Sequence, residues 1–375
     1  MNLALSEEQE ILKKAARDFF EEKCPKSFVK QMEQDEKGYS PELWEEMATL
    51  GWTGLLFPEK YGGSGMNFLD LAVLLEEMGR ACLPAPFSPT VVLGGLPILD
   101  AGSEKQKERY LPEVAKGKAI FTLALIEPEL GYEPRAIATE ATPNGDAYVI
   151  SGIKLFVPYA NVADYLLCVA RTSKQEEGIT IFVVDAKNPG IKCTVLETMA
   201  HDKLCEVVFD NVRVPKENIL GQLDQGWPEV QKTVERSDAA KCCELIGNFQ
   251  WVLEDTIAYA KDRKQFDRSI GSFQVIQHYC ADIAIYVEGA RLAAYQAAWM
   301  VSEGLPCAKE IAVAKSGIST VSPSIFDLAH QIHGAIGVTL EHDLHFYTTR
   351  AKVIELSYGA SNYYREVVAS ETSLA

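Results

Sequence analysis

The chain of 375 residues is 47% hydrophobic and 24% charged, and its formal net charge is −17. This composition is typical of a soluble globular protein with two or three packed regions, and no apolar run approaches the ~20 residues that a membrane-spanning helix needs. A charge of −17 disfavours nucleic acid as a partner, because phosphates are bound by a basic face. The N-terminal residues lack the basic and apolar regions of a signal peptide, so we expect a cytoplasmic protein.

The cysteines and histidines do not form the sequence pattern of a disulfide framework or a metal site. Nine cysteines are scattered along the chain, and we interpret them as small apolar residues of a protein from a reducing compartment. No C-x-x-C or H-E-x-x-H occurs. His342 and His345 flank Asp343, but no third ligand is near in the sequence, so we expect no metal site there.

The segment 1–118 is predicted to be a helical domain. Ser6 and Gln9 form the pattern of a capping box, in which each side chain accepts the backbone N–H of the other residue. Ile11 and Phe19 then fall on one face of a helix with the spacing of an amphipathic segment.

The segment 119–222 is predicted to be a β domain. Short runs rich in β-branched and aromatic residues, such as I-T-I-F-V-V-D at 179–185, are bounded by Gly, Pro, Asn or Asp. No helix-length segment separates these runs, so an antiparallel barrel or sandwich fits better than a parallel α/β sheet. The chain has no G-x-G-x-x-G after a strand and no G-x-x-x-x-G-K-[ST], which disfavours a Rossmann dehydrogenase and a P-loop enzyme.

The segment 223–375 is predicted to be helical again, with turns at 263–271, 304–306 and 334–339. The fold class is therefore α+β, with an N-terminal helical domain, a central antiparallel β-barrel or sandwich and a C-terminal helical domain.

The turn at 263–278 is the most informative stretch, and it reads R-K-Q-F-D-R-S-I-G-S-F-Q-V-I-Q-H. An arginine at a helix end beside a turn that contains Gly271 can bind a pyrophosphate bidentately. Spacing alone also fits an ordinary turn between helices with a solvated cation. The motif R-x-x-F…I-G-x-F-Q, however, resembles the signature by which the acyl-CoA dehydrogenase family binds FAD across a subunit interface.

Further motifs extend this resemblance over nearly the whole chain. P-E-K-Y-G-G-S-G-M at 58–66 resembles the family's first domain, and Q-I-H-G-A-I-G-V-T-L-E-H at 331–342 resembles its second flavin-contacting loop. E-P at 127–128, S-G-I-K at 151–154 and F-D-N-V-R-V-P at 209–215 lie between them in the family's order. The resemblance implies a C-terminal four-helix bundle and FAD-dependent α,β-dehydrogenation of an acyl-CoA thioester. It also implies that an electron-transferring flavoprotein accepts the electrons.

The resemblance also implies which residues bind FAD. In this family each FAD lies between two subunits, so each subunit contributes residues to two flavin sites. We call the residues that complete a neighbour's site the lent half and the residues of the subunit's own site the owned half. The lent half comprises Arg263, Gln265, Phe266, Phe273, Gln274, Gln331, Gly334 and Gly337. The owned half comprises Leu125, Ile126, Phe156, Val157 and Pro158.

The owned half departs from the family pattern. L-I-E-P stands in place of L-T-E-P, so Ile126 removes a hydroxyl group. F-V-P stands in place of W-I-T, so Pro158 removes both a hydroxyl group and an N–H donor. Tyr132 takes the position of a serine in the family's A-G-S-D loop, and we expect it to bind substrate together with Arg236 and Tyr358.

The position of the catalytic base also departs from the pattern. The reaction needs a carboxylate of raised pKa to remove the α-proton of the thioester. The family's commonest base is the Glu of Y-E-G-T, but here S-Y-G-A puts Tyr358 at that position. A phenol with an ordinary pKa of ~10 is a poor base at neutral pH.

Two acidic residues are alternative candidates for the base. Some relatives place the Glu before an Arg on the first long helix of the C-terminal domain, which favours Glu235, followed by Arg236. An ungapped count back from the flavin-binding arginine instead gives Ser237 and Asp238. Glu235 and Asp238 share a helix face, so either could act, and two solvated acids on an amphipathic helix fit the pattern equally.

Three functions follow from these motifs. The first is a homotetrameric acyl-CoA dehydrogenase that acts on an unusual thioester. The second is a non-catalytic subunit that completes the flavin site of its partner in a heterotetramer, because the chain keeps the half that it lends and varies the half that it owns. The third is a family relative with altered flavin chemistry, such as an oxidase or a decarboxylase.

Overall fold

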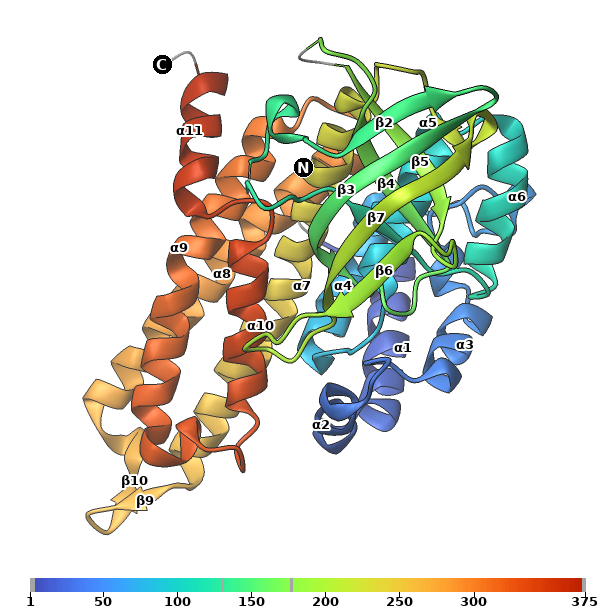
Figure 1. The fold of residues 1–375 in the computed structure, drawn as a ribbon. Coiled ribbons are helices and arrows are strands. Elements are labelled where there is room, and N and C mark those ends of the chain that lie inside the picture. Colours follow the sequence, from blue (N-terminus) through green and yellow to red (C-terminus); the bar gives the residue numbers. More distant parts are fainter. Residues whose placement is uncertain (1–3, 130, 176–177, 373–375) are drawn as a thin grey trace. The chain divides into compact units, whose positions relative to one another are not determined.

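The computed structural model describes residues 4–129, 131–175 and 178–372 (Figure 1). Its contacts divide the chain into two compact units. The helical unit comprises Met1–Val29, Asn67–Leu83 and Asp238–Ala375, and the sheet unit comprises Lys30–Met66 and Pro84–Ser237. Along the chain, helices precede and follow a central sheet, which confirms the predicted α+β fold class. In the described ranges, no helix is long and apolar enough to cross a membrane. The domain limits at residues 118 and 222 stay a prediction.

Helices make up most of the helical unit. They are α1 (Glu7–Lys23), α4 (Phe68–Ala81), α8 (Gln274–Ser302), α9 (Ala308–His333), α10 (Leu344–Leu356) and α11 (Ser361–Glu371). Two more helices, α2 (Lys26–Gln34) and α7 (Trp227–Asp262), begin in one unit and end in the other. The predicted capping box is confirmed, because Ser6 and Gln9 cap α1 reciprocally. Between residues 223 and 372, a short fifth helix, α11, follows the four helices that the resemblance implied.

Helix α4 carries two buried carboxylates, each with a cationic partner. Glu76 lies 3.0 Å from Lys13 and 2.5 Å from Arg291, and Glu77 lies 2.8 Å from Arg17. Buried carboxylates need such partners, because an unpaired charge in the interior is strongly destabilising. These ion pairs therefore connect α4 to α1 and α8.

Helices α4 and α7 approach each other closely at two glycines. A Cβ atom at Gly79 would lie 1.7 Å from the backbone oxygen of Glu244, and one at Gly247 would lie 1.7 Å from the backbone oxygen of Glu76. No side chain fits in that space, so both positions require glycine.

The sheet unit contains short helices followed by strands. The helices are α3 (Pro41–Thr49), the π-helical segment η3 (Pro89–Gly95), α5 (Leu96–Ala101) and α6 (Glu104–Ala115), with short 3-10 turns at η1 (Trp52–Gly54), η2 (Glu59–Tyr61), η4 (Pro134–Ala136) and η5 (Lys216–Asn218). The strands are β1 (Phe121–Ala124), β2 (Glu140–Asn144), β3 (Ala147–Pro158), β4 (Tyr165–Arg171), β5 (Ile179–Asp185), β6 (Ile191–Val195), β7 (Leu204–Pro215) and β8 (Ile219–Leu220). Within the described residues they form one sheet of order β6-β7-β3-β2-β4-β5-β8, with β1 beside β4.

The sheet is mixed, which refines the expectation of a purely antiparallel β domain. Most neighbours are antiparallel, but β1 pairs with β4 in parallel, and β2 meets β4 in parallel at Glu140 and Arg171. Between β1 and β4 the chain forms the β2–β3 hairpin, after which β4 runs in the same direction as β1. The core of the unit includes the stacked rings of Phe121 and Tyr165, whose centroids lie 4.9 Å apart.

Candidate active site

The turn after α7 is a hairpin that presents an aromatic ring to solvent. Its strands are β9 (Lys264–Gln265) and β10 (Arg268–Ser269), and Phe266 and Asp267 both have positive φ in the turn between them. Phe266 is 87% exposed, and Arg263 at the base of the hairpin is also exposed. An exposed aromatic residue beside an exposed arginine suits a contact outside the chain.

The second predicted flavin loop docks onto the end of α7. The loop is η7 (Gly334–Val338), and Gly334 has φ 65° where α9 ends. The hydroxyl group of Tyr259 donates to the carbonyl oxygen of His333 (3.3 Å), and the two rings stack with centroids 4.5 Å apart. The backbone N–H of Arg263 donates to the carbonyl oxygen of Tyr259 (2.8 Å). Tyr259 therefore links the two predicted flavin segments, which lie about seventy residues apart in the sequence.

In the sheet unit, a buried ion pair joins two of the family motifs. Nζ of Lys154 lies 2.6 Å from Oε1 of Glu127 and donates to the carbonyl oxygen of Leu125 (3.1 Å). Backbone N–H groups of Ala138 and Thr139 also donate to the Glu127 carboxylate. Burial alone would raise the pKa of Glu127, but the Lys154 charge and these hydrogen bonds bring the pKa below its usual value.

The segment that replaces W-I-T contains a strained bulge. Phe156 has φ 54°, and the pairing of β3 with β7 shifts register between Lys154 and Val157. Val157 is buried, whereas the side chain of Phe156 is largely exposed. Bulges and strained residues are frequent beside functional sites, because they turn a side chain away from its regular direction. The segment thus presents the ring of Phe156 where the family pattern has a tryptophan.

The structure distinguishes the two candidate bases on α7. Asp238 is 1% exposed, Nζ of Lys315 lies 3.4 Å from its Oδ1, and the hydroxyl group of Tyr364 donates to its Oδ2 (2.5 Å). Burial raises the pKa of Asp238 despite the nearby Lys315 charge. Glu235 is half-buried and lies three residues earlier on the same helix. Asp238 is therefore held in an internal polar network, whereas Glu235 is accessible to solvent.

The predicted substrate residues belong to different units. Arg236 and Tyr132 belong to the sheet unit, and Tyr358 belongs to the helical unit. Arg236 pairs with Asp100, which also lies 2.7 Å from Nζ of Lys232. An arginine already paired with a carboxylate is less available for a substrate anion.

Comparisons with known proteins agree with this geometry. Residues 6–118 match the N-terminal, 122–212 the middle and 224–372 the C-terminal domain model of acyl-CoA dehydrogenase. The chain belongs to the acyl-CoA dehydrogenase family. It is 33% identical to the probable acyl-CoA dehydrogenase YngJ of Bacillus subtilis over 99% of each chain. It is 32% identical to the caffeyl-CoA reductase–Etf complex subunit CarC of Acetobacterium woodii, over 97% of this chain and 98% of that one.

The fold is also similar to that of solved structures. A chain of the ChsE4–ChsE5 complex from Mycobacterium tuberculosis is 26% identical, with a TM-score of 0.91 over 100% of both chains. Members of the acyl-CoA dehydrogenase family are FAD-dependent oxidoreductases, and so is this protein. Its residues fit FAD, because the exposed guanidinium of Arg263 can pair with a pyrophosphate and the exposed ring of Phe266 can pack on the cofactor.

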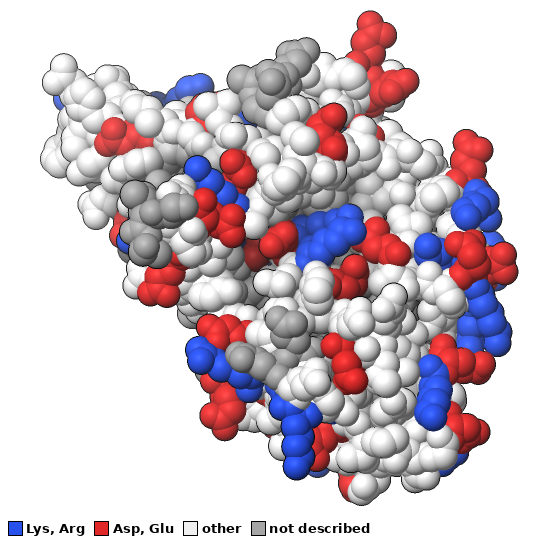
Figure 2. All heavy atoms as spheres, turned by 90° about the horizontal axis from the view of Figure 1, so that it is seen from above, with Lys and Arg blue, Asp and Glu red and all other residues white. Residues whose placement is uncertain are grey.

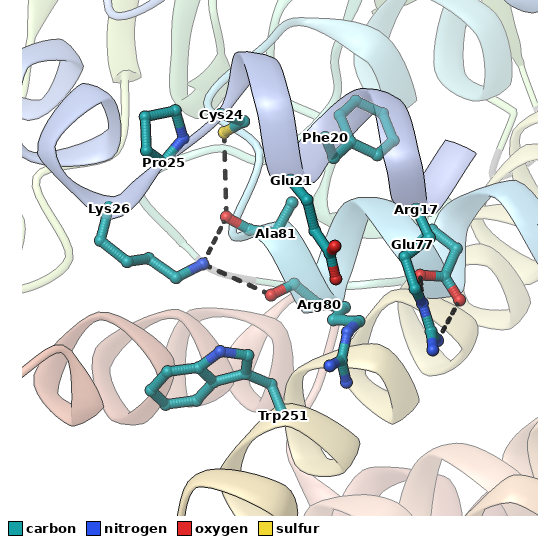
Figure 3. Close-up of a pocket in the computed structure, with 10 residues that line it drawn as sticks. All are labelled: Arg17, Phe20, Glu21, Cys24, Pro25, Lys26, Glu77, Arg80, Ala81 and Trp251. Carbon is teal, nitrogen blue, oxygen red and sulfur yellow. Dashed lines mark hydrogen bonds and ion pairs between the residues drawn. The ribbon is translucent and has the colours of Figure 1, made fainter. Parts of the chain in front are cut away.

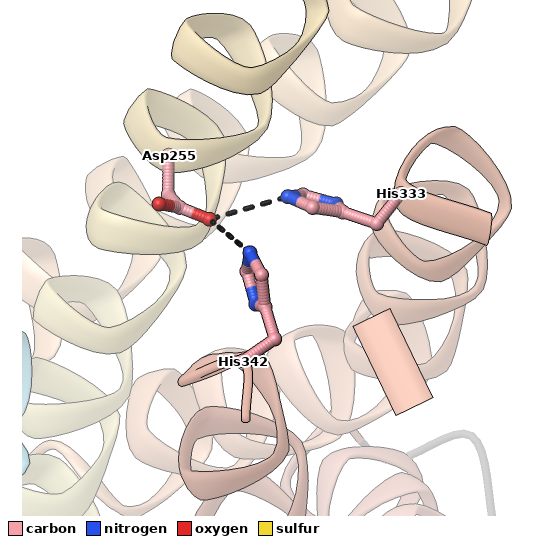
Figure 4. Close-up of side chains that lie close together, drawn as sticks. All are labelled: Asp255, His333 and His342. Atoms are coloured by element: carbon pink, nitrogen blue, oxygen red, sulfur yellow. Dashed lines mark ion pairs between the residues drawn. The ribbon is translucent and has the colours of Figure 1, made fainter. Parts of the chain in front are cut away.

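His333 and His342, which flank the second predicted flavin loop in the sequence, form a cluster with Asp255 (Figure 4). Nε2 of His333 lies 3.2 Å and Nε2 of His342 lies 3.7 Å from Oδ2 of Asp255. The backbone N–H of Leu344 donates to Nδ1 of His342 (3.2 Å), so the proton of the neutral ring is on Nε2 and points at the carboxylate. In the neutral ring of His333 the proton is on Nδ1, which donates to the carbonyl oxygen of Ala329 (2.8 Å), so its Nε2 faces Asp255 with a lone pair. Among the described residues, neither this Nε2 nor Oδ2 of Asp255 has a hydrogen-bond partner.

A pocket of about 190 Å³ in the helical unit is lined by three cations, of which two are ion-paired and the third contacts a carbonyl oxygen and two aromatic rings (Figure 3). Arg17 pairs with Glu77 and Arg80 pairs with Glu254 (2.6 Å). Lys26 donates to the carbonyl oxygen of Ala81 (2.9 Å) and lies over the rings of Trp251 and Tyr347. The pocket is therefore not a ready site for an anion, and no sequence-predicted site residue lines it.

Proposed function

We propose that the protein oxidises an acyl-CoA thioester to the α,β-unsaturated thioester. When bound, FAD accepts the β-hydrogen as hydride. The full-length match to the family models carries this proposal, and the paired flavin segments of the helical unit support it. On the face shown in Figure 2, lysine and arginine side chains lie among acidic ones, so an anionic CoA ester needs local cations rather than a broad basic surface.

Glu235 is the proposed general base. It takes the α-proton of the thioester on a carboxylate oxygen, and a glutamate reaches one methylene further than an aspartate. The buried network around Asp238 supports this assignment, because its carboxylate already has a lysine and a tyrosine as partners. A general base works best when its pKa lies near the operating pH, so the bound substrate must help to desolvate Glu235.

An electron-transferring flavoprotein is the proposed acceptor, and similarity to a subunit of a reductase–Etf complex supports it. The exposed Phe266 supports an oligomer in which the hairpin completes a neighbour's flavin site. A homotetramer is the leading assembly. A heterotetramer is the second, favoured by Ile126 and Pro158 in the owned half and by similarity to a two-component complex. Cytoplasmic location remains a prediction, which fractionation of cells would test.

Purification of the chain alone tests the function. A homo-oligomeric enzyme should carry stoichiometric FAD, and an anaerobic titration with straight, branched and cyclic acyl-CoA thioesters should bleach the flavin absorbance. A colourless or insoluble chain that becomes yellow only with a second subunit would support the heteromeric role. Rapid oxygen uptake by the reduced protein would identify an oxidase instead.

A further inference from the structure

The turn between α10 and α11 holds an aromatic residue in an unfavourable backbone conformation. It reads S-Y-G-A at 357–360, where Tyr358 has φ 54° and Gly359 has φ 129°. A bulky residue rarely adopts a positive φ, because its Cβ crowds the backbone. Such a conformation persists only where contacts with the surrounding residues stabilise it, and it is frequent at functional sites.

Two side chains from α9 and α11 hold the carbonyl groups of this turn. Nζ of Lys315 donates to the carbonyl oxygens of Ile354 (2.6 Å) and Ser357 (3.1 Å). The hydroxyl group of Tyr364 lies 3.0 Å from the carbonyl oxygen of Tyr358 and 2.5 Å from Oδ2 of Asp238, so its single proton is shared between these two acceptors. The last carbonyl groups of a helix have no partner within the helix, so these donors fix the direction in which the chain leaves α10.

Asp238 connects the two donors. Its Oδ1 lies 3.4 Å from Lys315, and its Oδ2 accepts from Tyr364 at 2.5 Å. All three side chains are buried, so their polar groups depend on partners within the protein for hydrogen bonds. A buried ion pair contributes little net stability compared with apolar residues of the same volume, but it can specify one conformation. Here Lys315 and Tyr364 contact the turn, so the conformation that they specify is that of the turn.

We propose that Asp238, Lys315 and Tyr364 form a positioning device that fixes Tyr358 for contact with the acyl thioester. Asp238 is then a positioning residue, not the base. The contact between Tyr358 and substrate rests on the proposed function, whereas the positioning of the turn does not. The ring of Tyr358 is also held from α7, because Nζ of Lys241 lies 5.1 Å from the ring centroid, one helical turn after Asp238.

The first test needs no substrate and uses the FAD-loaded protein. Tyr364→Phe removes the hydroxyl group but keeps the packed ring, and Tyr286→Phe on α8 is the control. Backbone amide exchange of residues 357–361 should rise at least ~10-fold in Tyr364→Phe and stay unchanged in Tyr286→Phe, because the turn loses a donor only in the first variant. Unchanged exchange at 357–361 in Tyr364→Phe would overturn the positioning role.

The second test is a double-mutant cycle of Tyr364→Phe and Tyr358→Ala. The measured quantity is the second-order rate of flavin bleaching by the fastest of butyryl-, isobutyryl-, glutaryl- and cyclohexanecarbonyl-CoA. If Tyr364 acts through Tyr358, its substitution should slow bleaching at least ~5-fold alone and not further when Tyr358 is already alanine. Independent, multiplicative effects would refute the substrate contact. If no thioester bleaches the wild-type flavin, the proposed function and this contact both fail, and the exchange result still decides the positioning of the turn.

Discussion

Substitution of Lys154 by methionine tests the buried ion pair between the two motifs of the sheet unit. Lys154 is completely buried, and its partner Glu127 is 4% exposed. Removal of one member of a buried pair leaves an uncompensated charge and typically costs about 3–5 kcal/mol. Glu127 retains the backbone donors of Ala138 and Thr139, so the expected loss lies at the lower end, about 3 kcal/mol.

Urea denaturation of the FAD-loaded protein, followed by fluorescence and circular dichroism, measures this loss. Lys187→Met is a matched control, because Lys187 pairs with Asp164 at 3.4 Å but is 80% exposed. A surface pair contributes ~0–1 kcal/mol, so the control should remain close to the wild type. The double variant Lys154→Met, Glu127→Gln should recover part of the loss, since no buried charge remains. A Lys154→Met protein as stable as the Lys187→Met control would show that the buried ion pair is not needed for stability.

The same pair predicts a dependence of stability on pH. The pKa of Glu127 is lowered in the folded protein, so its contribution is fully present above the unfolded pKa of ~4.3. The contribution is lost as the pH falls through the folded pKa, because the carboxylate must then be protonated. The difference in unfolding free energy between wild type and Glu127→Gln should therefore shrink below pH ~4.3. A difference that is constant from pH 7 to pH 3 would contradict this.

Two further substitutions test the FAD contact of Arg263 and the close approach of α4 and α7. Arg263→Ala should weaken FAD retention by roughly 1.5–3 kcal/mol, as expected for a lost charge-assisted contact, and FAD content after gel filtration measures this against Lys264→Ala. Unchanged FAD affinity would remove Arg263 from the site. Gly247→Ala should destabilise the protein by ~1–3 kcal/mol or more, because a Cβ there would lie 1.7 Å from the backbone oxygen of Glu76. Gly317→Ala, where a Cβ would meet nothing within 4 Å, should not destabilise it.

Local patterns and ordered motifs predicted much of the fold. The Ser6 capping box depends on residues three apart, and the turn after α7 depends on one short segment, so both are readable from the sequence. The β9–β10 hairpin within this turn was not predicted. The parallel pairing of β1 with β4 was not predicted, because strand direction depends on contacts across about forty residues.

The internal network around the candidate base could not be predicted from the sequence. Asp238 and Lys315 lie 77 residues apart, and no periodic pattern marks a lysine on α9 as the partner of an aspartate on α7. In the sequence, His342 likewise has Asp343 and His345 as near neighbours. Asp255 and His333 come close to it only in the folded chain. Tertiary contacts between distant polar residues leave no signal in a single sequence.

We propose that this protein is an acyl-CoA dehydrogenase whose base is Glu235. Anaerobic stopped-flow mixing of the FAD-loaded protein with the best acyl-CoA thioester measures flavin bleaching in a single turnover. Glu235→Gln should keep FAD and bind the thioester but bleach at least ~100-fold more slowly than wild type, the lower end of what a general base contributes. Bleaching of Glu235→Gln at the wild-type rate would contradict the assignment of the base, and absence of bleaching in the wild type by any thioester would contradict the function itself.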